Sequence, residues 1–344
     1  MSEAMMELIP NLPEEIGLEC LFRLSYKAHR VAARVCRRWR ELIDSREFYY
    51  QRKQSGNTHK VACLIQSLPV ETAVDGRKPV GAPAYGVSVF NPSGGTWERL
   101  EPVPDYPLGL PLFCQLSSVE GKLVLMGGWN PARWEPVKDV FIYDFTAGQW
   151  RRGKDMPSKR SFFATGALEE RIFVAGGHDE NKTALKSAWV YDVRRDEWEE
   201  ISEMTQERDE CEGVVIGNEF WVVSGYSTEN QGVFEVSAEC YEMETDQWRR
   251  VEGAWAAGRC PRACVGVGKE EELVCWADSE SVVRVGACAV GLGEQTLVTG
   301  SAYLGAPQGV FLVGMKEGQN GKLEKIDVPT GFSGFVQSGC CVEI

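Results

Sequence analysis

An aromatic residue stands seven positions before a tryptophan at four places in this chain, and the tryptophans follow one another at intervals of 53, 48 and 50 residues. In three of these repeats a glycine, paired with a second one in two of them, lies 15 or 16 residues before the aromatic residue. The segments read FNPSGGTW (90–97), YDFTAGQW (143–150), YDVRRDEW (191–198) and YEMETDQW (241–248). A repeat of about 50 residues built from short strands is typical of one four-stranded blade of a β-propeller. The repeat therefore predicts an all-β propeller over residues 60–344.

The residues of the repeat have structural roles in this interpretation. Glycines at the end of a strand permit positive φ and a close approach of neighbouring backbones. The tyrosine and tryptophan rings are expected to pack between adjacent blades, where their polar atoms can meet backbone groups. This structural set comprises Trp97, Gly127, Gly128, Tyr143, Trp150, Gly176, Gly177, Tyr191, Trp198, Gly225, Tyr241 and Trp248.

The number of blades follows from the short β-type runs, such as VACLIQ at 61–66 and KLVLMGG at 122–128. Residues 260–300 and 301–328 keep this rhythm but lack the paired glycines and the tryptophan. The first blade lacks its first strand, and residues 335–344 resemble one. A C-terminal strand at about 335–344 would close the ring, which removes exposed sheet edges. We expect six blades, with five and seven left open.

Residues 1–54 have the pattern of helices and form a separate part. Pro13 suits a first helical turn, and Ser25 suits a helix N-cap. Val31, Val35 and Trp39 recur at the spacing of one helix face. A unit of this size buries too little surface to stand alone, so it is expected to lean on a partner or on the next domain. Residues 55–59 read as a linker.

Charge is distributed unevenly between the two parts. The chain holds 37 basic and 50 acidic residues, a net charge of −13. An acidic body argues against nucleic acid as the main partner, because phosphates would be repelled over most of the surface. The basic residues concentrate at 23–40, where no acidic residue interrupts them. An Arg-rich face beside an apolar stripe fits docking onto an acidic protein.

Several classes of protein are not indicated. No run of 18 apolar residues predicts a membrane span, and the acidic N-terminus does not resemble a signal peptide. Twelve cysteines in such a chain indicate reduced thiols, which predicts the cytoplasm, the nucleus or both. Cys260 and Cys264 form a C-x3-C pair without a second pair or a nearby histidine, so we expect no metal, no cofactor and no catalytic residues.

The two parts together resemble the plant F-box/kelch-repeat proteins. The F-box likeness depends on LIPNLPEEIGLECLFRL and VCRRWRELIDSREF across residues 8–48, and the kelch likeness depends on the repeat described above. The resemblance implies a three-helix F-box domain (1–54) followed by a kelch propeller (60–344). It implies a substrate receptor of an SCF (Skp–cullin–F-box) ubiquitin ligase, which binds the Skp-type adaptor and through it the cullin.

By position in the F-box motif, eight residues would form or support the adaptor-binding surface: Leu12, Pro13, Ile16, Leu21, Leu24, Val35, Cys36 and Trp39. The alternative is that several of them only hold the helices together. The basic run at 23–40 would suit an acidic adaptor.

The propeller would bind a protein substrate through loops at one end of its channel. One group of candidates follows the second strands: Trp129, Asn130, Arg133, Trp134, His178, Asp179, Asn181 and Tyr226. A second group lies where first strands begin: Arg160, Arg208, Arg259 and Arg262. Arginine suits bidentate recognition of carboxylates, and two tryptophans on one loop suit an interface anchor. The alternative for each residue is a solvated loop position.

The opening MELIPNLPEEIGLECLFRLSYK resembles a plant subgroup whose members send phenylalanine ammonia-lyase or cytokinin response regulators to degradation. The resemblance thus implies a negative regulator of phenylpropanoid biosynthesis, with type-B cytokinin response regulators as the second target. Two other functions stay open. The propeller could act as a scaffold or inhibitor without recruiting a ligase, or it could be a metal-dependent kelch enzyme.

Overall fold

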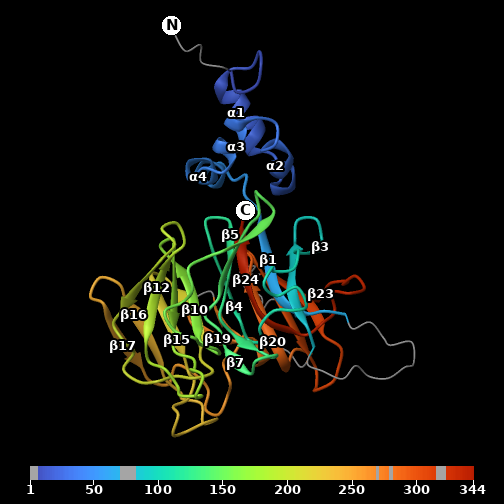
Figure 1. The fold of residues 1–344 in the computed structure, drawn as a ribbon. Helices are drawn as coiled ribbons and strands as arrows, with labels where there is room; N and C mark the ends of the chain where they lie inside the picture. The colour runs from blue at the N-terminus through green and yellow to red at the C-terminus, as the bar shows by residue number, and fades with distance from the viewer. Residues whose placement is uncertain (1–6, 70–82, 269–270, 279–281, 315–322) are drawn as a thin grey trace.

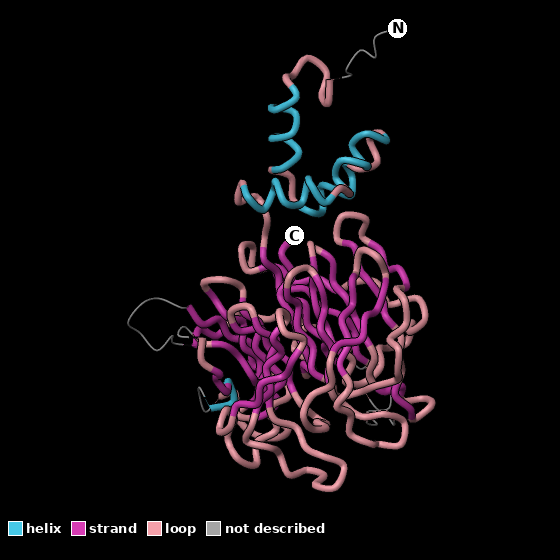
Figure 2. The backbone as a smooth tube through the Cα atoms, turned by 90° about the vertical axis from the view of Figure 1, so that its left-hand side faces the viewer, coloured by secondary structure: helices cyan, strands magenta, loops and turns pink. Residues whose placement is uncertain are grey.

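The structure is a computed structural model that describes residues 7–69, 83–268, 271–278, 282–314 and 323–344. It consists of a small helical unit that sits on one end of a β-propeller (Figure 1). The view turned by 90° shows the same arrangement, with long loops at the end of the propeller away from the helices (Figure 2). None of the described helices is both long enough and apolar enough to span a membrane.

The helical unit contains four helices rather than the three that were expected: α1 (Glu14–Phe22), α2 (Tyr26–Ala32), α3 (Arg37–Ile43) and α4 (Arg46–Gln54). The N-caps of α2, α3 and α4 are Ser25, Cys36 and Ser45. Each of these side chains accepts a hydrogen bond from a backbone N–H in the first turn of its helix. The Cys36 cap divides the predicted single stripe, because it separates Val31 on α2 from Trp39 on α3. The periodicity across 31–39 was therefore wrongly interpreted as one helix face.

The propeller is built mainly from five four-stranded antiparallel sheets. In spatial order of strands, the first sheet is β24 (Val336–Glu343), β1 (Lys60–Ser67), β2 (Tyr85–Asn91) and β3 (Thr96–Arg99). The next three are β4 (Gln115–Val119), β5 (Lys122–Met126), β8 (Val140–Asp144), β9 (Gln149–Arg152); β10 (Ala164–Leu168), β11 (Arg171–Ala175), β12 (Ala188–Asp192), β13 (Glu197–Ile201); and β14 (Glu212–Ile216), β15 (Glu219–Val223), β16 (Ala238–Glu242), β17 (Gln247–Val251). The last is β20 (Val285–Gly291), β21 (Gln295–Ser301), β22 (Gly309–Gly314) and β23 (Leu323–Lys325).

Two smaller sheets complete the described strands. A hairpin of β6 (Trp129–Asn130) and β7 (Glu135–Pro136) lies in the loop after β5. The second small sheet contains β18 (Val265–Val267) and β19 (Leu273–Cys275), and the 3₁₀ turn Trp276–Asp278 follows it. This sheet lies between β14 and β20, where a further blade was expected. Six full blades are therefore not confirmed, because only five described sheets have four strands.

The two ends of the propeller chain meet in the first sheet. β24 pairs antiparallel with β1 from Lys60–Glu343 onward, with one irregularity between Ile65 and Gln66. Next to this pairing, the backbone N–H of His59 donates to Ile344 O over 2.7 Å, and Ile344 N–H donates to His59 O over 2.9 Å. The C-terminus consequently lies directly below the helical unit (Figure 1).

The aromatic repeat forms cross-strand pairs in the third and fourth strands of the blades. Tyr143 stands opposite Trp150, and Tyr191 stands opposite Trp198, in register. Their ring centroids lie 5.1 and 4.7 Å apart. Trp150 Nε1 donates to the carbonyl of Glu101 over 2.8 Å, in the segment that follows the preceding blade. The indole thus covers its tyrosine and also ties two consecutive blades together.

The paired glycines after the second strands lie against other backbone segments: Gly176 approaches Arg208 of the next blade, and Gly177 approaches the segment before the first strand of its own blade. Gly177 has φ +81°, and a Cβ atom there would lie 2.4 Å from the carbonyl oxygen of Ser161. The third repeat has Ser224 and Gly225 in place of two glycines, and Ser224 adopts φ +58°. The paired positions of this repeat are therefore Ser224 and Gly225, and Tyr226 corresponds to His178 and Trp129.

We expect Gly177→Ala to destabilise the propeller more than Gly232→Ala. Gly232 has nearly the same φ, +79°, but a Cβ atom would meet nothing within 4 Å there. Both changes place an L-residue in the left-handed region, at a cost of about 1 kcal/mol. Only Gly177→Ala also forces the Ser161 backbone away, which adds about 1–3 kcal/mol. Urea unfolding of the two variants measures the difference, and equal losses of stability would contradict the close approach.

Candidate adaptor surface and substrate-binding face

The helical unit exposes a small group of apolar side chains that no other part of the described chain covers. Ile16 is 50% exposed, Val31 is 66% exposed and Val35 is 63% exposed. Pro13 and Cys36 are exposed as well. Ile16 lies on α1, and Val35 precedes α3; the Arg38–Glu14 ion pair at 2.5 Å links these two elements. We call Pro13, Ile16, Val31, Val35 and Cys36 the exposed apolar surface.

The remaining residues predicted for adaptor binding support this surface from below. Leu21 is fully buried in the core of the unit, together with Phe22, Ile43 and Phe48. Leu24 and Trp39 are half-buried against the same core, and Leu12 is half-buried. Trp39 Nε1 donates to the carbonyl of Leu8 over 2.8 Å. Leu21 is thus a core residue, and Trp39 holds the N-terminal segment onto α3.

Part of the basic run contacts the propeller of the same chain. Arg30 Nε donates to the carbonyl of Phe145 over 3.0 Å, and its Nη2 donates to the Tyr143 hydroxyl over 3.0 Å. Lys27 pairs with Glu98 at 2.6 Å. The expectation that the whole run suits an acidic adaptor was wrong for Lys27 and Arg30, because these two charges bind the propeller of the same chain.

A departure from the repeat makes room for Arg30. In the third and fourth blades, an aspartate between the two aromatics, Asp196 or Asp246, accepts a hydrogen bond from the repeat tyrosine. Gly148 occupies this position in the second blade, and a Cβ atom there would lie 2.7 Å from Arg30 Nε. The guanidinium of Arg30 therefore fills the space that an aspartate would take, and it contacts Tyr143.

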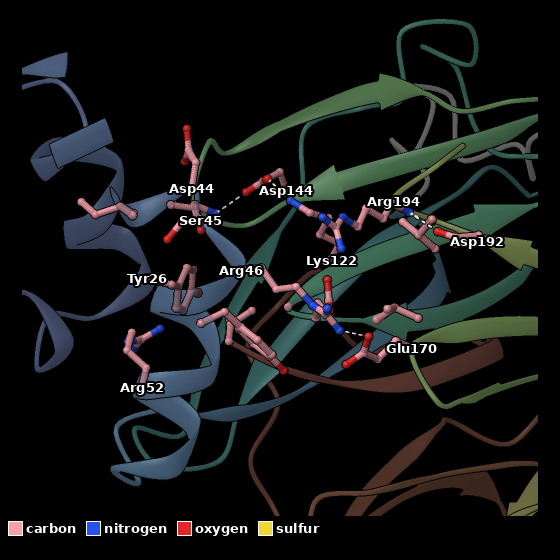
Figure 3. Close-up of a pocket in the computed structure, with 18 of the residues that line it drawn as sticks. Tyr26, Asp44, Ser45, Arg46, Arg52, Lys122, Asp144, Glu170, Asp192 and Arg194 are labelled. Atoms are coloured by element: carbon pink, nitrogen blue, oxygen red, sulfur yellow. Dashed lines mark hydrogen bonds and ion pairs between the residues drawn. The ribbon is translucent and has the colours of Figure 1, made fainter. Parts of the chain in front are cut away.

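Further ion pairs hold α4 against two turns between first and second strands and against the end of β24. Arg46 pairs with Glu120 and Glu170, and Lys53 pairs with Glu343 at 3.2 Å. Figure 3 shows Arg46 reaching from the helix to Glu170, in a cleft of about 870 Å³ between the helical unit and the propeller. The lining side chains carry both charge signs and pair across the cleft, so it serves as the contact between the two parts.

The opposite end of the propeller carries the loops after the second strands. Trp129, His178 and Tyr226 follow the glycine positions of three consecutive blades, and each forms a β-bridge with the segment before a first strand. Trp129 is half-buried, whereas His178 and Tyr226 are each 6% exposed. All three lie at the mouth of the central channel, at the end away from the helices.

A cluster of rings and charges joins these positions, and we call it the mouth cluster. The Phe113 and Phe162 rings stack with centroids 4.2 Å apart, and His178 lies 5.3 Å from Phe162 and 5.7 Å from Trp129. The Arg262 guanidinium lies 4.7 Å from the Phe162 centroid, within the range of a cation–π contact. The cluster comprises Phe113, Trp129, Phe162, His178, Asp209, Glu210, Tyr226 and Arg262.

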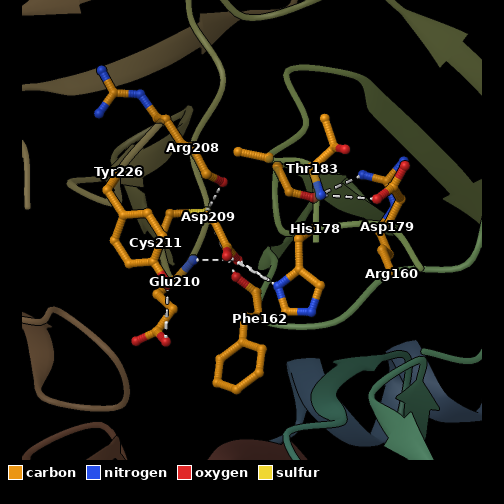
Figure 4. Close-up of polar contacts among 12 residues, drawn as sticks. Arg160, Phe162, His178, Asp179, Thr183, Arg208, Asp209, Glu210, Cys211 and Tyr226 are labelled. Carbon is orange, nitrogen blue, oxygen red and sulfur yellow. Dashed lines mark hydrogen bonds and ion pairs between the residues drawn. The ribbon is translucent and has the colours of Figure 1, made fainter. Parts of the chain in front are cut away.

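Carboxylates hold the polar atoms of this cluster in place (Figure 4). His178 Nδ1 lies 2.9 Å from Asp209 Oδ1, and the Tyr226 hydroxyl donates to Glu210 over 3.2 Å. The other oxygen of Glu210 lies 3.1 Å from Arg262 Nε. Side chains from four loops are therefore fixed relative to one another before any partner binds.

Four members of the mouth cluster were missed from the sequence: Phe113, Phe162, Asp209 and Glu210. Phe113, Phe162 and Glu210 occupy equivalent places before a first strand, and each adopts a left-handed φ of 50–58°. A residue with a side chain in this conformation gives no local signal as glycine does. Aligning the segments around Cys114, Phe163 and Cys211 would have revealed the recurring position.

Arg160 and Arg208 do not lie on the surface, which corrects the substrate-binding role predicted for them. They are 1% and 0% exposed. Arg208 donates to the carbonyls of Ser224 and Ser237 over 2.8 and 3.1 Å, and its Nε lies 3.0 Å from the buried Glu239 carboxylate. Arg160 makes the equivalent bonds to Gly176 and Ser187. Burial lowers the pKa of Arg160 to about 10.

The loop candidates divide into turn-forming and exposed residues. Asn130 Oδ1 accepts from the backbone N–H of Ala132 over 2.9 Å, and Asp179 Oδ1 accepts from that of Asn181 over 2.8 Å, so both side chains shape their own turns. Arg133 and Asn181 are exposed. Trp134, at the tip of the β6–β7 hairpin, is 73% exposed and is the largest apolar side chain offered on this face.

A basic pocket of about 700 Å³ adjoins the mouth cluster. Arg259, Arg262 and Arg284 line it together with Phe113 and Phe335, and none of its described lining residues is acidic. The pocket belongs to the incomplete part of the ring, around the β18–β19 sheet. A site with three arginines in a chain of net charge −13 favours a partner that presents carboxylates or other anions.

Comparison with known proteins identifies both parts. A model described as the KLHDC2/KLHL20/DRC7 Kelch-repeats domain matches residues 75–270, and the F-box domain model matches residues 9–51. The F-box/kelch-repeat protein At1g15670 of Arabidopsis thaliana is 37% identical over 362 residues, covering 98% of this chain and 100% of the relative. The chain belongs to the F-box/kelch-repeat family.

Other members of the family from Arabidopsis thaliana match shorter regions. At1g80440 is 42% identical over 245 residues, which cover 71% of this chain and 69% of the relative. SKIP20 is 38% identical over 285 residues, which cover 72% of this chain and 67% of the relative. An F-box domain implies binding to a Skp1-type adaptor, and F-box/kelch-repeat proteins are generally substrate adaptors without catalysis of their own.

The kelch propeller offers no evident metal centre in its described residues. In the part of the chain that the structure describes, no three His, Cys, Asp or Glu side chains are grouped so that they could hold a metal ion. In the mouth cluster, Nδ1 of His178 lies beside Asp209, and Nε2 of His178 is buried without a hydrogen-bond partner in the structure.

We expect Arg208→Ala to destabilise the kelch propeller by about 3–5 kcal/mol, because it leaves the Glu239 carboxylate buried without its cation. Arg133→Ala removes an exposed arginine from the same face and should change stability by less than about 0.5 kcal/mol. Chemical denaturation of both variants gives the comparison. A fully stable Arg208→Ala protein would return this residue to the set of candidate substrate contacts.

Proposed function

We propose that this chain is the substrate receptor of an SCF ubiquitin ligase, with the adaptor bound at one end and the target at the other. The observation that carries the proposal is that the F-box and the candidate substrate-binding face lie at opposite ends of the propeller. The exposed apolar surface lies on the F-box, which sits at one end of the propeller. The mouth cluster, the basic pocket and Trp134 lie at the opposite end.

The contact between the domains supports this role. A receptor raises the effective concentration of its target near the ubiquitin-charged partner, and a fixed geometry makes that increase larger. Arg30, Arg46 and Lys53 each join the F-box to the propeller through ion pairs or hydrogen bonds. Tyr26 adds a buried ring, which lies 5.6 Å from the Phe145 ring. The propeller, and the target bound to it, would therefore have a defined orientation relative to the F-box and the adaptor.

The target would present an acidic segment to the basic pocket and an apolar hollow to Trp134. The resemblance of the first residues of the chain to one plant subgroup supports phenylalanine ammonia-lyase as the target, and hence a negative role in phenylpropanoid biosynthesis. Type-B cytokinin response regulators are the second candidate on the same ground. Both would be met in the cytoplasm or the nucleus, where we propose that the receptor acts.

We expect Ile16→Asp to abolish co-purification of the Skp-type adaptor and the cullin from plant cells treated with a proteasome inhibitor. Ile16 is 50% exposed, so the change places a charge in an apolar contact without disturbing the core. The matched control is Leu304→Asp, which alters an 88% exposed leucine of the propeller and should leave adaptor binding intact.

A target that stays bound to Ile16→Asp and accumulates in these cells would be the substrate. If wild-type protein recovers no adaptor, the ligase proposal fails, and a scaffold or inhibitor that acts through the propeller alone takes its place. If both aspartate variants lose the adaptor, the exposed apolar surface is not the specific binding site.

We expect Trp134→Ala to weaken binding of the target about ten-fold or more, since an exposed indole that becomes buried often dominates an interface. Trp134→Phe should retain most of the affinity because it keeps an aromatic ring. Binding of purified phenylalanine ammonia-lyase, and separately of a type-B response regulator, is measured by biolayer interferometry. Thermal melting provides the control, because a residue that is 73% exposed should not affect the melting temperature. Loss of stability together with binding would make Trp134 a structural residue.

A further inference from the structure

Two cysteines of the incomplete blade lie close enough to react with each other. The Sγ atoms of Cys264 and Cys275 are 3.7 Å apart. Cys275 ends β19, and Cys264 immediately precedes β18, where its carbonyl accepts a hydrogen bond from Trp276 N–H over 2.8 Å. The two residues are thus neighbours across one antiparallel pair of strands.

An arginine distinguishes this pair from the other thiols. Arg259 Nη1 donates to Cys275 Sγ over 3.2 Å. The hydrogen bond with the Cys264 thiol and the nearby Arg259 guanidinium lower the pKa of Cys275. The same hydrogen bond between the two thiols raises the pKa of Cys264. By contrast, burial raises the pKa of Cys114, Cys211 and Cys288 to about 12. A thiolate held beside a cation, partly exposed and next to a second thiol, has the features of a reactive cysteine.

We propose that Cys264 and Cys275 form a reversible disulfide when the protein meets a peroxide. The Cys275 thiolate attacks one oxygen of the peroxide, the O–O bond breaks, and Cys275 becomes a sulfenic acid as hydroxide leaves and takes up a proton to form water. The Cys264 thiol then loses its proton and attacks the Cys275 sulfur, which releases a second water and forms the S–S bond. Overall, two thiols and one hydrogen peroxide give one disulfide and two waters, and a dithiol reductant reverses the oxidation.

The local structure permits the small movement that the bond requires. A disulfide needs the sulfur atoms to approach to about 2.05 Å, so the present separation must shrink by about 1.7 Å. In the described residues, the β18–β19 sheet has two strands of three residues each, whereas five other sheets have four strands. A rotation about χ1 and a slight shift of such a short sheet are less costly than they would be inside a full blade.

The pair also lies beside the basic pocket, whose lining includes Cys264 and Arg259. A disulfide carries no charge, so oxidation removes the thiolate to which Arg259 donates and makes the pocket wall more positive. Resting on the proposed function, this change would strengthen the binding of an acidic target segment. The disulfide would then link the oxidation state of the cell to capture of the target.

The test uses purified full-length protein, which is fully reduced and then exposed to a small molar excess of hydrogen peroxide. Free thiols are blocked with N-ethylmaleimide, and the disulfides are mapped by mass spectrometry. We expect a Cys264–Cys275 link as the main product, lost on treatment with dithiothreitol. Cys260→Ser changes the cysteine that precedes Cys264 in the sequence and should leave the link intact, whereas Cys275→Ser should abolish the link. With Cys264→Ser, a dimedone-reactive sulfenic acid should persist on Cys275.

A second measurement on wild-type protein avoids any effect of substitution on folding. At neutral pH, we expect trace iodoacetamide to label Cys275 at least about ten-fold faster than Cys260, in keeping with its thiolate character. Labelling of Cys275 that is no faster than that of Cys260, or a main disulfide between other cysteines, would overturn the proposal. Neither measurement involves the adaptor or the target, so its outcome is independent of the ligase assay with Ile16→Asp.

Discussion

The pairing of β24 with β1 is the constraint on which the rest of the molecule depends. It joins the last strand of the chain to the first strand after the F-box, so that the sheets close into a ring instead of ending at exposed edges. The same pairing brings Glu343 beneath the F-box, where its carboxylate accepts from Thr58 and pairs with Lys53. Ring closure and domain docking are thus coupled, because loss of the closing strand would also remove the Glu343 contacts to Thr58 and Lys53.

Departures from the repeat mark the places where this propeller has acquired specific contacts. Gly148 stands where the third and fourth blades have an aspartate, and Arg30 of the F-box fills the space that this side chain would take. After the second strands, the backbone geometry is kept from blade to blade while the side chain varies between Trp129, His178 and Tyr226. The regular residues therefore build the ring, and the irregular ones determine what it contacts.

The sequence was most informative where a side chain has the same neighbour in every blade. The aromatic and tryptophan of YDFTAGQW stand opposite each other in a tight hairpin, so their spacing along the chain reflects a direct contact. Contacts that depend on distant segments left no such trace. In the sequence, Arg208 resembles a solvated charge on a loop. The structure shows instead that its side chain is buried and binds the carbonyls of Ser224 and Ser237 and the carboxylate of Glu239.

The helix boundaries were harder to predict from the sequence, because the spacing of apolar residues does not reveal where an N-cap starts a new helix. Val31, Val35 and Trp39 follow the period of one helix, yet the Cys36 side chain accepts from Trp39 N–H and starts a new helix between them. The break changes the chemistry of the surface, since Val31 and Val35 are left exposed while Trp39 turns back to the core. Apolar residues at helical spacing thus supplied both the core and the exposed surface.

The incomplete blade concentrates the features that no repeat residue explains. The described part of this segment contains two strands, β18 and β19, and the basic pocket with Arg259 and Arg262 lies beside them. Fewer strands mean fewer backbone hydrogen bonds and looser packing, which allows a pocket to form and two cysteines to move. A full blade in this position would stabilise the ring more, but its packed sheet would leave less room for the pocket and the thiol pair. Stability therefore comes from the five complete sheets, and the sixth position is where binding and chemical modification can be accommodated.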